Sequence, residues 1–157
     1  MNKVLKIINS GQTGVERGAL DESIKHDILI GGWYTSNISD NDYYVGSKYK
    51  GLSESITKEP NQHLDLNVID SDAILIITNK TTESNRVNEI KSFAFRYKKP
   101  IFMIKEPKDI ANCAKWLDSL DDHLIINVTG PTEKEFYNGY KLAREVLNYI
   151  FLFFKYD

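Results

Sequence analysis

The sequence predicts an α/β fold with a doubly wound, mainly parallel, five-stranded sheet and helices on both faces. Short segments rich in β-branched residues alternate with segments in which apolar residues recur at helical spacing. Residues 73–78 are apolar on both faces, as a central parallel strand should be. The length of 157 residues, 41% of them hydrophobic, fits a single domain over residues 1–157.

The first half of the chain is expected to begin with a strand over residues 4–8 and a helix over residues 15–26. A second short strand is expected at residues 28–30, closed by a Gly-Gly pair. Residues 33–60 are polar, aromatic and irregular, which indicates a long excursion over the edge of the sheet. Residues 62–69 are expected to form a short helix or turn.

The second half continues the alternation of strands and helices. The last helix is expected from about Glu133 to about Phe154, with Thr132 or Thr129 as its N-cap and acidic residues in its first turn. The other elements expected here are strands at residues 73–78, 100–104 and 124–128, and helices at residues 86–97 and 109–118.

Composition excludes several classes of protein. Twenty basic and 22 acidic residues give a net charge of -2, which disfavours a nucleic-acid partner. The single cysteine rules out an internal disulfide framework and any multi-cysteine metal site. No apolar run approaches the roughly 18–20 residues of a membrane span, and the N-terminal segment lacks the pattern of a signal peptide. We therefore expect a cytoplasmic protein with no membrane partner.

Ligands of open parallel sheets bind outside the carboxyl ends of the strands. The loop directly after the first strand is the most informative of these segments, because its glycines permit a tight turn and its amides begin a helix. Such a loop favours an anion, although an ordinary strand-to-helix turn would have similar spacing. On the anion hypothesis, Gly11→Val should abolish ligand binding while leaving the fold largely intact. The candidate ligand-binding residues of this loop are Ser10, Gly11, Gln12, Thr13 and Gly14.

The helix after this loop opens with Glu16 and Arg17. Arg17 is a candidate phosphate ligand and Glu16 a candidate partner of a ribose hydroxyl. The alternative is a surface ion pair between Arg17 and Asp21, which are four residues apart.

Gly32 and Trp33 follow the second predicted strand and are candidate ligand-binding residues. Trp33 could stack on a flat heterocycle or cap the core. Trp33→Ala should weaken the binding of ring-bearing ligands. Four tyrosines in the excursion could line a ligand lid or pack against a neighbouring subunit: Tyr34, Tyr43, Tyr44 and Tyr49.

A second polar loop follows the central strand and supplies hydroxyl, amide and ammonium groups for a second phosphate. Its alternative role is helix capping, with Ser84 or Asn85 as N-cap. Asn67, Asp70 and Asp72 precede the central strand, where residues 70–72 could hydrogen-bond a sugar, hold a cation through water or simply form a turn. The candidate ligand-binding residues of the loop after the central strand are Asn79, Lys80, Thr81 and Thr82. The turn after the last strand adds Gly130.

The sequence contains no recognisable catalytic set, so we expect neither catalytic residues nor a metal site. His26, His63 and His123 have no ligand spacing and are expected to be structural or exposed. Cys113 falls on an apolar helix face and is expected to be inert. The aromatic C-terminal segment 151–156 could pack on the sheet or form a subunit interface, and we expect a homo-oligomer.

Residues 10–21, Ser-Gly-Gln-Thr-Gly-Val-Glu-Arg-Gly-Ala-Leu-Asp, resemble the opening signature of the "putative molybdenum carrier" family. That family belongs to the SLOG superfamily of Rossmann-like nucleotide-binding domains, alongside the YpsA-like proteins. Weaker matches follow in the expected order over residues 5–150, at residues 31–33, 49–54, 67–73, 99–100 and 127–131. The chain departs from the family pattern at Glu16, usually aspartate, and at residues 80–82, usually rich in glycine.

The resemblance implies a Rossmann-like fold and a ligand crevice, with molybdenum cofactor or an ADP-ribose-type nucleotide as the bound molecule. The first functional hypothesis is therefore a binding protein for a nucleotide-like, phosphate-bearing small molecule. The alternative is a nucleoside monophosphate N-glycosidic hydrolase similar to the lysine-decarboxylase-like group. A DNA-binding role similar to that of DprA-type proteins is disfavoured by the net charge of -2.

Overall fold

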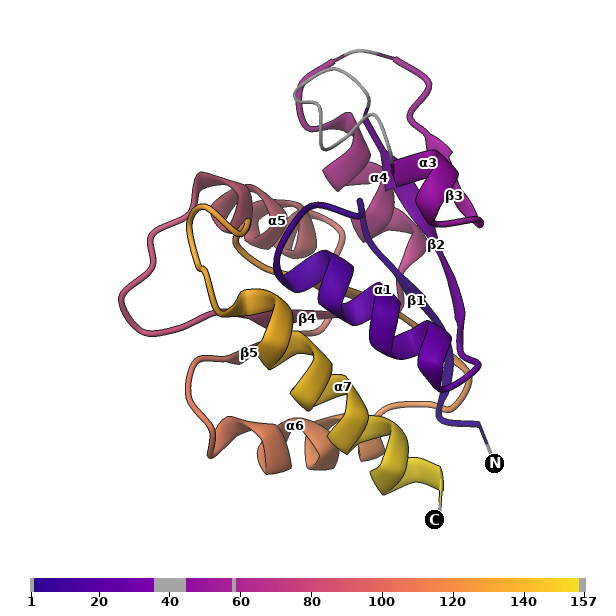
Figure 1. Cartoon of the computed structure of the whole chain (residues 1–157), viewed down its shortest axis with the longest axis vertical. Coiled ribbons are helices and arrows are strands. Elements are labelled where there is room, and N and C mark those ends of the chain that lie inside the picture. Colours follow the sequence, from indigo (N-terminus) through magenta and orange to yellow (C-terminus); the bar gives the residue numbers. More distant parts are fainter. Residues whose placement is uncertain (1, 36–44, 58, 156–157) are drawn as a thin grey trace.

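The computed structural model describes residues 2–35, 45–57 and 59–155. Six parallel strands form one sheet in the order β3-β2-β1-β6-β4-β5, with helices packed on both faces (Figure 1). The predicted α/β class and parallel sheet are thus confirmed, with one strand more than expected. The strands are β1 (Val4–Ile8), β2 (Leu29–Tyr34), β3 (Leu52–Glu54), β4 (Ala73–Ile77), β5 (Ile101–Ile104) and β6 (Leu124–Thr129).

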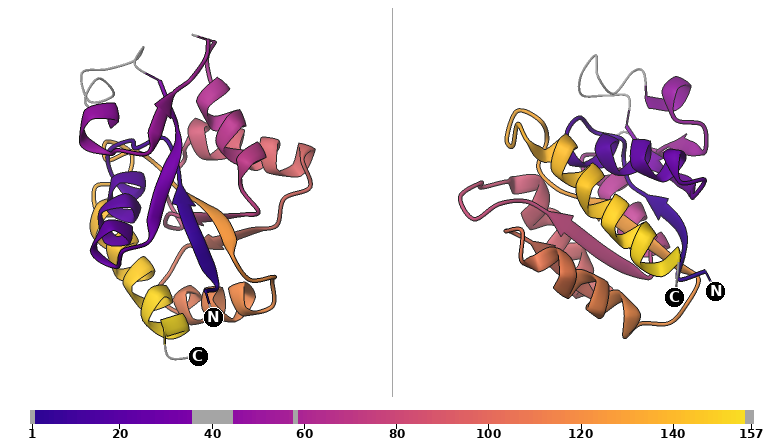
Figure 2. Two further views of the ribbon diagram at one scale, coloured as in Figure 1. Left: turned by 90° about the vertical axis from the view of Figure 1, so that its right-hand side faces the viewer. Right: turned by 60° about the horizontal axis from the view of Figure 1, so that its bottom comes forward.

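The helices form two layers, one on each face of the sheet (Figure 2). The first layer contains α1, α6 and α7, and the second contains α4 and α5. The short α3 lies beside β3 at the sheet edge. The helices are α1 (Val15–Lys25), α3 (Val45–Lys48), α4 (Gln62–Asp70), α5 (Asn85–Arg96), α6 (Asp109–Asp118) and α7 (Gly139–Lys155).

Both helix layers are needed to bury the side chains of β4. Leu75 and Ile77 pack into the core shared with α1, α6 and α7, whereas Ile74 and Ile76 pack against α4 and α5. All four side chains are at most 1% exposed. The unbroken apolar run therefore reports burial on both faces, as the sequence indicated.

The strand order brings the beginning and the end of the chain together at the centre of the sheet. β1 leads outward to β2 and β3, and β4 leads outward to β5 on the other side. β6 then enters between β1 and β4. The direction of winding reverses here, so the carboxyl ends of β1 and β6 mark the expected ligand crevice.

The sixth strand lies in the predicted excursion. β3 pairs with β2 through Gly32↔Leu52 and Trp33↔Ser53. Its three residues are too few to show alternation, and Leu-Ser-Glu lacks the β-branched residues that mark a strand.

Tyr49 belongs to the core, which corrects its expected place in a lid or subunit interface. It is 1% exposed and packs with Leu20, Val45 and Leu52. Its hydroxyl donates a hydrogen bond to Asp21 Oδ1 at 2.8 Å. Tyr34 packs against the same cluster, while Tyr43 and Tyr44 lie outside the described residues.

The last helix begins at Gly139, not near Glu133 as predicted. Thr129 ends β6, and Thr132 donates its backbone amide to Glu135 Oε1 at 3.0 Å in the preceding turn. A Cβ on Gly139 would lie 2.8 Å from Val15 Cγ2, so the helix starts where it packs closely on α1. The helix propensity of residues 133–138 suggested an earlier start, because propensity carries no information about a tertiary contact.

Two local predictions are confirmed. Ser84 caps α5, and its side chain accepts a hydrogen bond from the Val87 amide at 3.3 Å. Cys113 is fully buried, and burial raises the pKa of its thiol to about 12. None of the described helices is long and apolar enough to cross a membrane.

Candidate functional site

The loop after β1 uses two of its amides internally. The Gly11 amide donates to Asn9 Oδ1 at 2.9 Å, and the Gln12 amide donates to Glu16 Oε1 at 3.0 Å. The expectation of an open amide cradle is therefore wrong at these two positions. The carboxylate of Glu16 already lies at the N-terminus of α1, where a helix favours negative charge.

The glycines of the predicted site allow close contacts within the protein. Gly11 has a φ of +67°, and a Cβ there would lie 2.7 Å from Val45 Cγ1. Cβ atoms on Gly14 and Gly130 would approach Glu133 N to 2.8 Å and Ile77 O to 2.2 Å. Valine at position 11 would strain the backbone and clash with Val45 on α3, so we no longer expect Gly11→Val to leave the fold intact.

A buried charge cluster lies at the carboxyl end of β6. Glu16, from α1 on one side of the sheet, is 2% exposed. Its Oε2 accepts a hydrogen bond from Thr129 Oγ1 at 2.7 Å and lies 2.5 Å from Nη2 of Arg86, which comes from α5 on the other side. The contact with Arg86 is close but poorly aligned for a hydrogen bond, and Arg86 Nε and Nη2 have no hydrogen-bond partner among the described residues.

His63 on α4 adds a third titratable group to this cluster. Its side chain is nearly fully buried, and its Nδ1 has no hydrogen-bond partner within the described part of the chain. Burial lowers the pKa of His63 to about 4, helped by the positive charge of Arg86 and opposed by Glu16. His63 is therefore neutral at physiological pH.

Asn67 on α4 joins the ends of β1 and β2. Its Nδ2 donates to Ser10 Oγ and to the Trp33 carbonyl, both at 3.0 Å, and its Oδ1 accepts from the Trp33 amide at 2.8 Å. These bonds show that Asn67 organises the carboxyl ends of two strands. Ser10 is correspondingly buried.

The indole of Trp33 lies over the α4 side of the sheet. It is half-buried, and its Nε1 donates to Asp70 Oδ2 at 2.8 Å. Together with Gly32 it lines a hollow of about 400 Å³ that includes Lys6 and Ile125. The ring is thus held at its edge by Asp70 and borders a space of ligand size.

Arg17 supports the first loop from the side. Its Nε donates to the Gly11 carbonyl at 2.8 Å. Asp21, its expected ion-pair partner, accepts hydrogen bonds from the hydroxyls of Tyr49 and Tyr140 at 2.8 and 2.5 Å. Tyr49 follows α3 and Tyr140 belongs to α7, so Asp21 on α1 connects separate parts of the protein on this face of the sheet.

The loop after β4 is organised by Asn79. Its Oδ1 accepts hydrogen bonds from the amides of Thr81 at 3.0 Å and Thr82 at 2.7 Å. Lys80 forms an ion pair with Glu106, which follows β5. Asn79, Lys80 and Thr82 line a polar hollow of about 180 Å³ beside the start of α5. This places them two strands away from the first loop.

The loop after β6 connects the two predicted binding loops. The Glu133 amide donates to the Thr13 carbonyl at 3.2 Å, and Ser84 Oγ donates to Glu135 Oε1 at 3.2 Å. The predicted segments therefore meet through residues 130–138, with the Glu16–Arg86 pair beside them at the end of β6.

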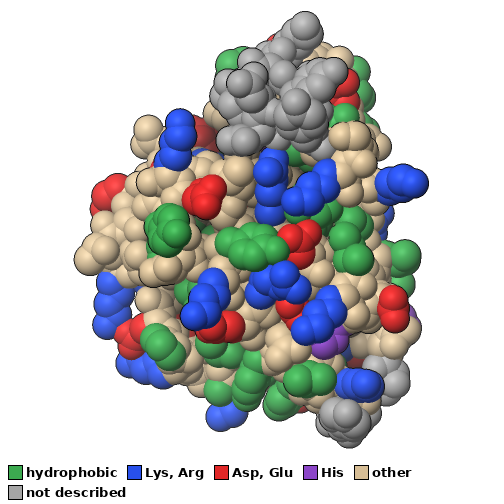
Figure 3. Space-filling view, in the orientation of Figure 1, with side chains coloured by type: hydrophobic (Ala, Val, Ile, Leu, Met, Phe, Trp, Pro, Cys, Tyr) green, Lys and Arg blue, Asp and Glu red, His purple; other side chains and the backbone are tan. Residues whose placement is uncertain are grey.

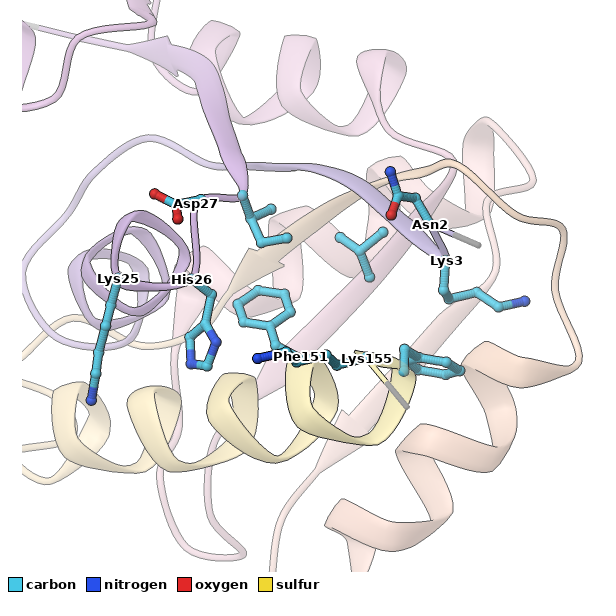
Figure 4. A pocket seen from close by; sticks show the side chains of 10 residues that line it. Asn2, Lys3, Lys25, His26, Asp27, Phe151 and Lys155 are labelled. Carbon is cyan, nitrogen blue, oxygen red and sulfur yellow. The ribbon is translucent and has the colours of Figure 1, made fainter. Parts of the chain in front are cut away.

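Another hollow, of about 360 Å³, lies at the amino ends of the strands (Figure 4). Lys3, Lys25 and Lys155 line it together with Phe151. Lys3 Nζ donates to the Leu120 carbonyl at 2.8 Å and pairs with Asp122 at 2.9 Å. This basic residue is thus already engaged, and the hollow lies at the opposite end of the sheet from the charge cluster.

Charged side chains are mixed on the face formed by α1 and α7. Figure 3 shows Lys and Arg interspersed with Asp and Glu, without a continuous basic stripe on that face. Among residues 2–35, 45–57 and 59–155, no group of three or more His, Cys, Asp or Glu side chains is placed to hold a metal ion.

Comparison with known families gives a match over residues 7–151. This segment matches the family model described as "Circularly permutated YpsA SLOG family". The chain belongs to this family. No curated protein matches it.

A solved structure supports the same assignment. A crystal structure is known of a "putative molybdenum carrier protein" from Syntrophus aciditrophicus SB, whose sequence is 32% identical to this SLOG chain. The match covers 96% of each chain, with a TM-score of 0.81. The resemblance inferred from residues 10–21 is therefore confirmed.

The sequence did not reveal the partners of the charge cluster. Arg86 and His63 are the second residues of α5 and α4, but neither has a spacing that relates it to Glu16. Thr129 was expected at a helix start and instead bonds the Glu16 carboxylate. Only the strand order, which the local patterns do not specify, places these residues together.

The low pKa of His63 predicts a specific loss of stability in mild acid. The unfolded chain takes up a proton near the ordinary pKa of 6.5, whereas the folded protein does so only near 4. Stability is therefore fully present above the unfolded pKa and falls as the pH drops toward the folded one. From about pH 7 to about pH 5, urea denaturation should show a loss of about 2 kcal/mol that His63→Gln lacks. Equal pH dependence in both proteins would contradict the assignment.

Proposed function

We propose that this SLOG protein binds a nucleotide-like, phosphate-bearing small molecule at the carboxyl ends of β1 and β6, without chemistry of its own. The observation that carries the proposal is the buried Glu16–Arg86 pair, whose guanidinium has donors without a hydrogen-bond partner in the described part of the chain. A buried ion pair contributes little to stability and is costly to desolvate. Unpartnered buried donors call for an explanation, and a ligand's oxygen atoms supply one.

The proposed ligand groups follow from the chemistry of the cluster. A guanidinium matches the oxygens of a phosphate, and a carboxylate accepts hydrogen bonds from sugar hydroxyls. Arg86 would hold the phosphate, while Glu16 would orient a ribose-like diol. The amides of Gly11 and Gln12 have internal acceptors and are left out of the proposal. The remaining proposed contacts are those predicted from the sequence: Ser10, Thr13, Gly14, Arg17, Gly32, Trp33, Asn79, Lys80, Thr81, Thr82 and Gly130.

Two ligand types fit this proposal. The name of the Syntrophus aciditrophicus protein suggests a molybdenum carrier. With no metal-binding cluster among the described residues, molybdenum cofactor would be held through its heterocycle and phosphate. An ADP-ribose-type nucleotide offers the same two groups. In either case the protein would work as a cytoplasmic carrier or sequestering protein, and as a homo-oligomer.

Mass spectrometry of the molecule released on denaturation tests the proposal directly. We expect a compound that carries a phosphate and a heterocycle. For protein obtained empty, ADP-ribose should raise the melting temperature of the wild type but not of Arg86→Lys, which keeps the charge and loses the planar fork. Lys141→Arg, an exposed change on α7, is the matched control.

The ring contact is tested in the same assay. Trp33→Ala should weaken ADP-ribose binding roughly tenfold and leave ribose 5-phosphate binding unchanged. No stabilisation by ADP-ribose or AMP, together with no released ligand, would refute the proposed function.

The position of Glu16 also favours the alternative, N-glycosidic hydrolysis of nucleoside monophosphates. The sequence lacks a suitably placed glutamate in the loop after β4, but the structure brings a buried carboxylate to the strand ends from α1. A carboxylate here could stabilise positive charge on the sugar while water adds at its anomeric carbon and the base leaves with a proton. Release of adenine from AMP by wild-type protein, absent in Glu16→Gln, would establish this activity in place of simple binding.

A further inference from the structure

An apolar groove lies far from the proposed site, along the free edge of β5. Its volume is about 810 Å³, and its apolar lining comes from the end of α5 and from β5. Phe95 is 89% exposed and Ile101 is 37% exposed. An aromatic side chain so fully exposed beside a sheet edge is unusual for a surface that serves only solubility.

The edge of β5 presents backbone groups that can pair with another strand. The carbonyls of Pro100 and Ile104 accept hydrogen bonds from Ile74 and Thr78 on the β4 side, both at 2.9 Å. Because both polar groups of a strand residue point to the same side, the N–H and C=O groups of Ile101 and Met103 point away from β4. β5 is the last strand of the described sheet, so this side has no neighbouring strand.

The same two residues contribute side chains to the groove. Side chains alternate along a strand, so Ile101 and Met103 share the face that carries α5. Met103 packs against the core beneath α5, and Ala94 and Phe95 complete the apolar lining. A strand added at this edge could therefore place an apolar side chain between β5 and Phe95.

The rim of the groove is basic. Lys91, Arg96, Lys98 and Lys99 surround it. Among the described residues, none of these four forms an ion pair with a carboxylate. The groove thus combines an apolar floor, free strand hydrogen bonds and an unbalanced positive charge.

We infer that the β5 edge binds an extended acidic segment of another protein, which adds as a strand beside Ile101 and Met103 and inserts an apolar side chain against Phe95. Charge decides between this partner and a second copy of the chain. Antiparallel pairing of two β5 edges would set Lys99 of one copy opposite Lys105 of the other, which is unfavourable. Glu106, the carboxylate that this pairing would bring near the rim, already pairs with Lys80 and Lys108. An acidic segment instead gains from all four cations, and strand addition is an established mode of peptide recognition.

The probe is the peptide acetyl-Glu-Asp-Val-Phe-Val-Asp-Glu-amide, titrated into isotope-labelled full-length protein and followed by NMR. We expect a dissociation constant of roughly 10–100 µM at low salt, weakened by added salt. The amide signals of Ile101 and Met103 should move more than those of Phe102 and Ile104, whose backbone groups face β4. The same peptide with lysine at its four acidic positions should bind at least about tenfold more weakly.

Phe95→Ala should weaken the binding of the acidic peptide about tenfold. Because Phe95 is exposed, the substitution should leave the fold unchanged. Ile56→Ala is the matched control, since Ile56 is 79% exposed and does not line the groove. The inference would be overturned by equal binding of the two peptides, by no shifts at about 1 mM peptide, or by an unaffected Phe95→Ala. It would also be overturned if free protein were a dimer that Phe95→Ala dissociates, because a second copy would then occupy the groove.

Discussion

Replacing Arg86 with methionine should lower the free energy of unfolding by about 3–5 kcal/mol. Methionine keeps the apolar stem but removes the positive charge, so the 2% exposed carboxylate of Glu16 is left buried without a counter-ion. Urea denaturation measures the loss. Arg96→Met, an exposed change at the other end of α5, should alter stability by less than about 0.5 kcal/mol.

A second variant separates the lost counter-ion from lost packing. Glu16→Gln in the Arg86→Met background removes the buried charge, while the glutamine oxygen can still accept from the Gln12 amide and its NH2 group can donate to the Thr129 hydroxyl. The double variant should therefore be more stable than Arg86→Met alone, by roughly 1–2 kcal/mol. A single variant that loses less than about 1 kcal/mol would show that water already compensates this carboxylate, and would remove the main support for a ligand at Arg86.

Local patterns predicted the fold because each of the five expected strands is encoded by adjacent residues. The run at residues 73–78 and the glycine loop after β1 depend on their own sequence, and both lie where expected. β3 escaped prediction because three residues carry too little periodicity, and it exists only by pairing with β2. The start of α7 escaped because Gly139, where the helix begins, is marked by a close tertiary approach to Val15 and by no local pattern.

The candidate site was predicted at the level of its loops but not of its chemistry. Loop positions follow from the rule that ligands bind at the carboxyl ends of parallel strands. The partners of each residue within the site do not follow from this rule. Glu16, Arg86 and Thr129 are brought together by the entry of β6 between β1 and β4. The sequence also cannot indicate that an amide such as that of Gly11 already has an internal acceptor.

Gly32→Ala should be more destabilising than any exposed substitution, with a loss of at least about 3 kcal/mol. Gly32 has a φ of +121°, a conformation that L side chains rarely adopt, and a Cβ there would lie 2.1 Å from the Asn9 carbonyl oxygen. Backbone atoms cannot move aside as the end of a flexible side chain can. β1 and β2 must therefore separate at their carboxyl ends to accommodate the methyl group.

The damage should extend to the charge cluster, because Asn9 is a structural centre of the first loop. Its Nδ2 donates to the carbonyls of Glu16 at 3.1 Å and Val128 at 2.9 Å, and its Oδ1 accepts from the Gly11 amide. Displacing Asn9 thus shifts the start of α1, the end of β6 and the glycine loop together. Gly32→Ala should accordingly abolish binding of ADP-ribose even in protein that remains folded at low temperature.

Gly51→Ala is the control that separates backbone strain from this contact. Gly51 also has a positive φ, +109°, but a Cβ there would meet only the Ile30 carbonyl, at 2.7 Å, away from Asn9. It should cost about 1–2 kcal/mol and, although Gly51 also borders the hollow beside Trp33, weaken ADP-ribose binding far less than Gly32→Ala does. Equal losses of stability and binding in the two variants would mean that strain at the sheet edge disrupts the site generally, and that the packing of Gly32 on Asn9 has no special role in holding the first loop against β6.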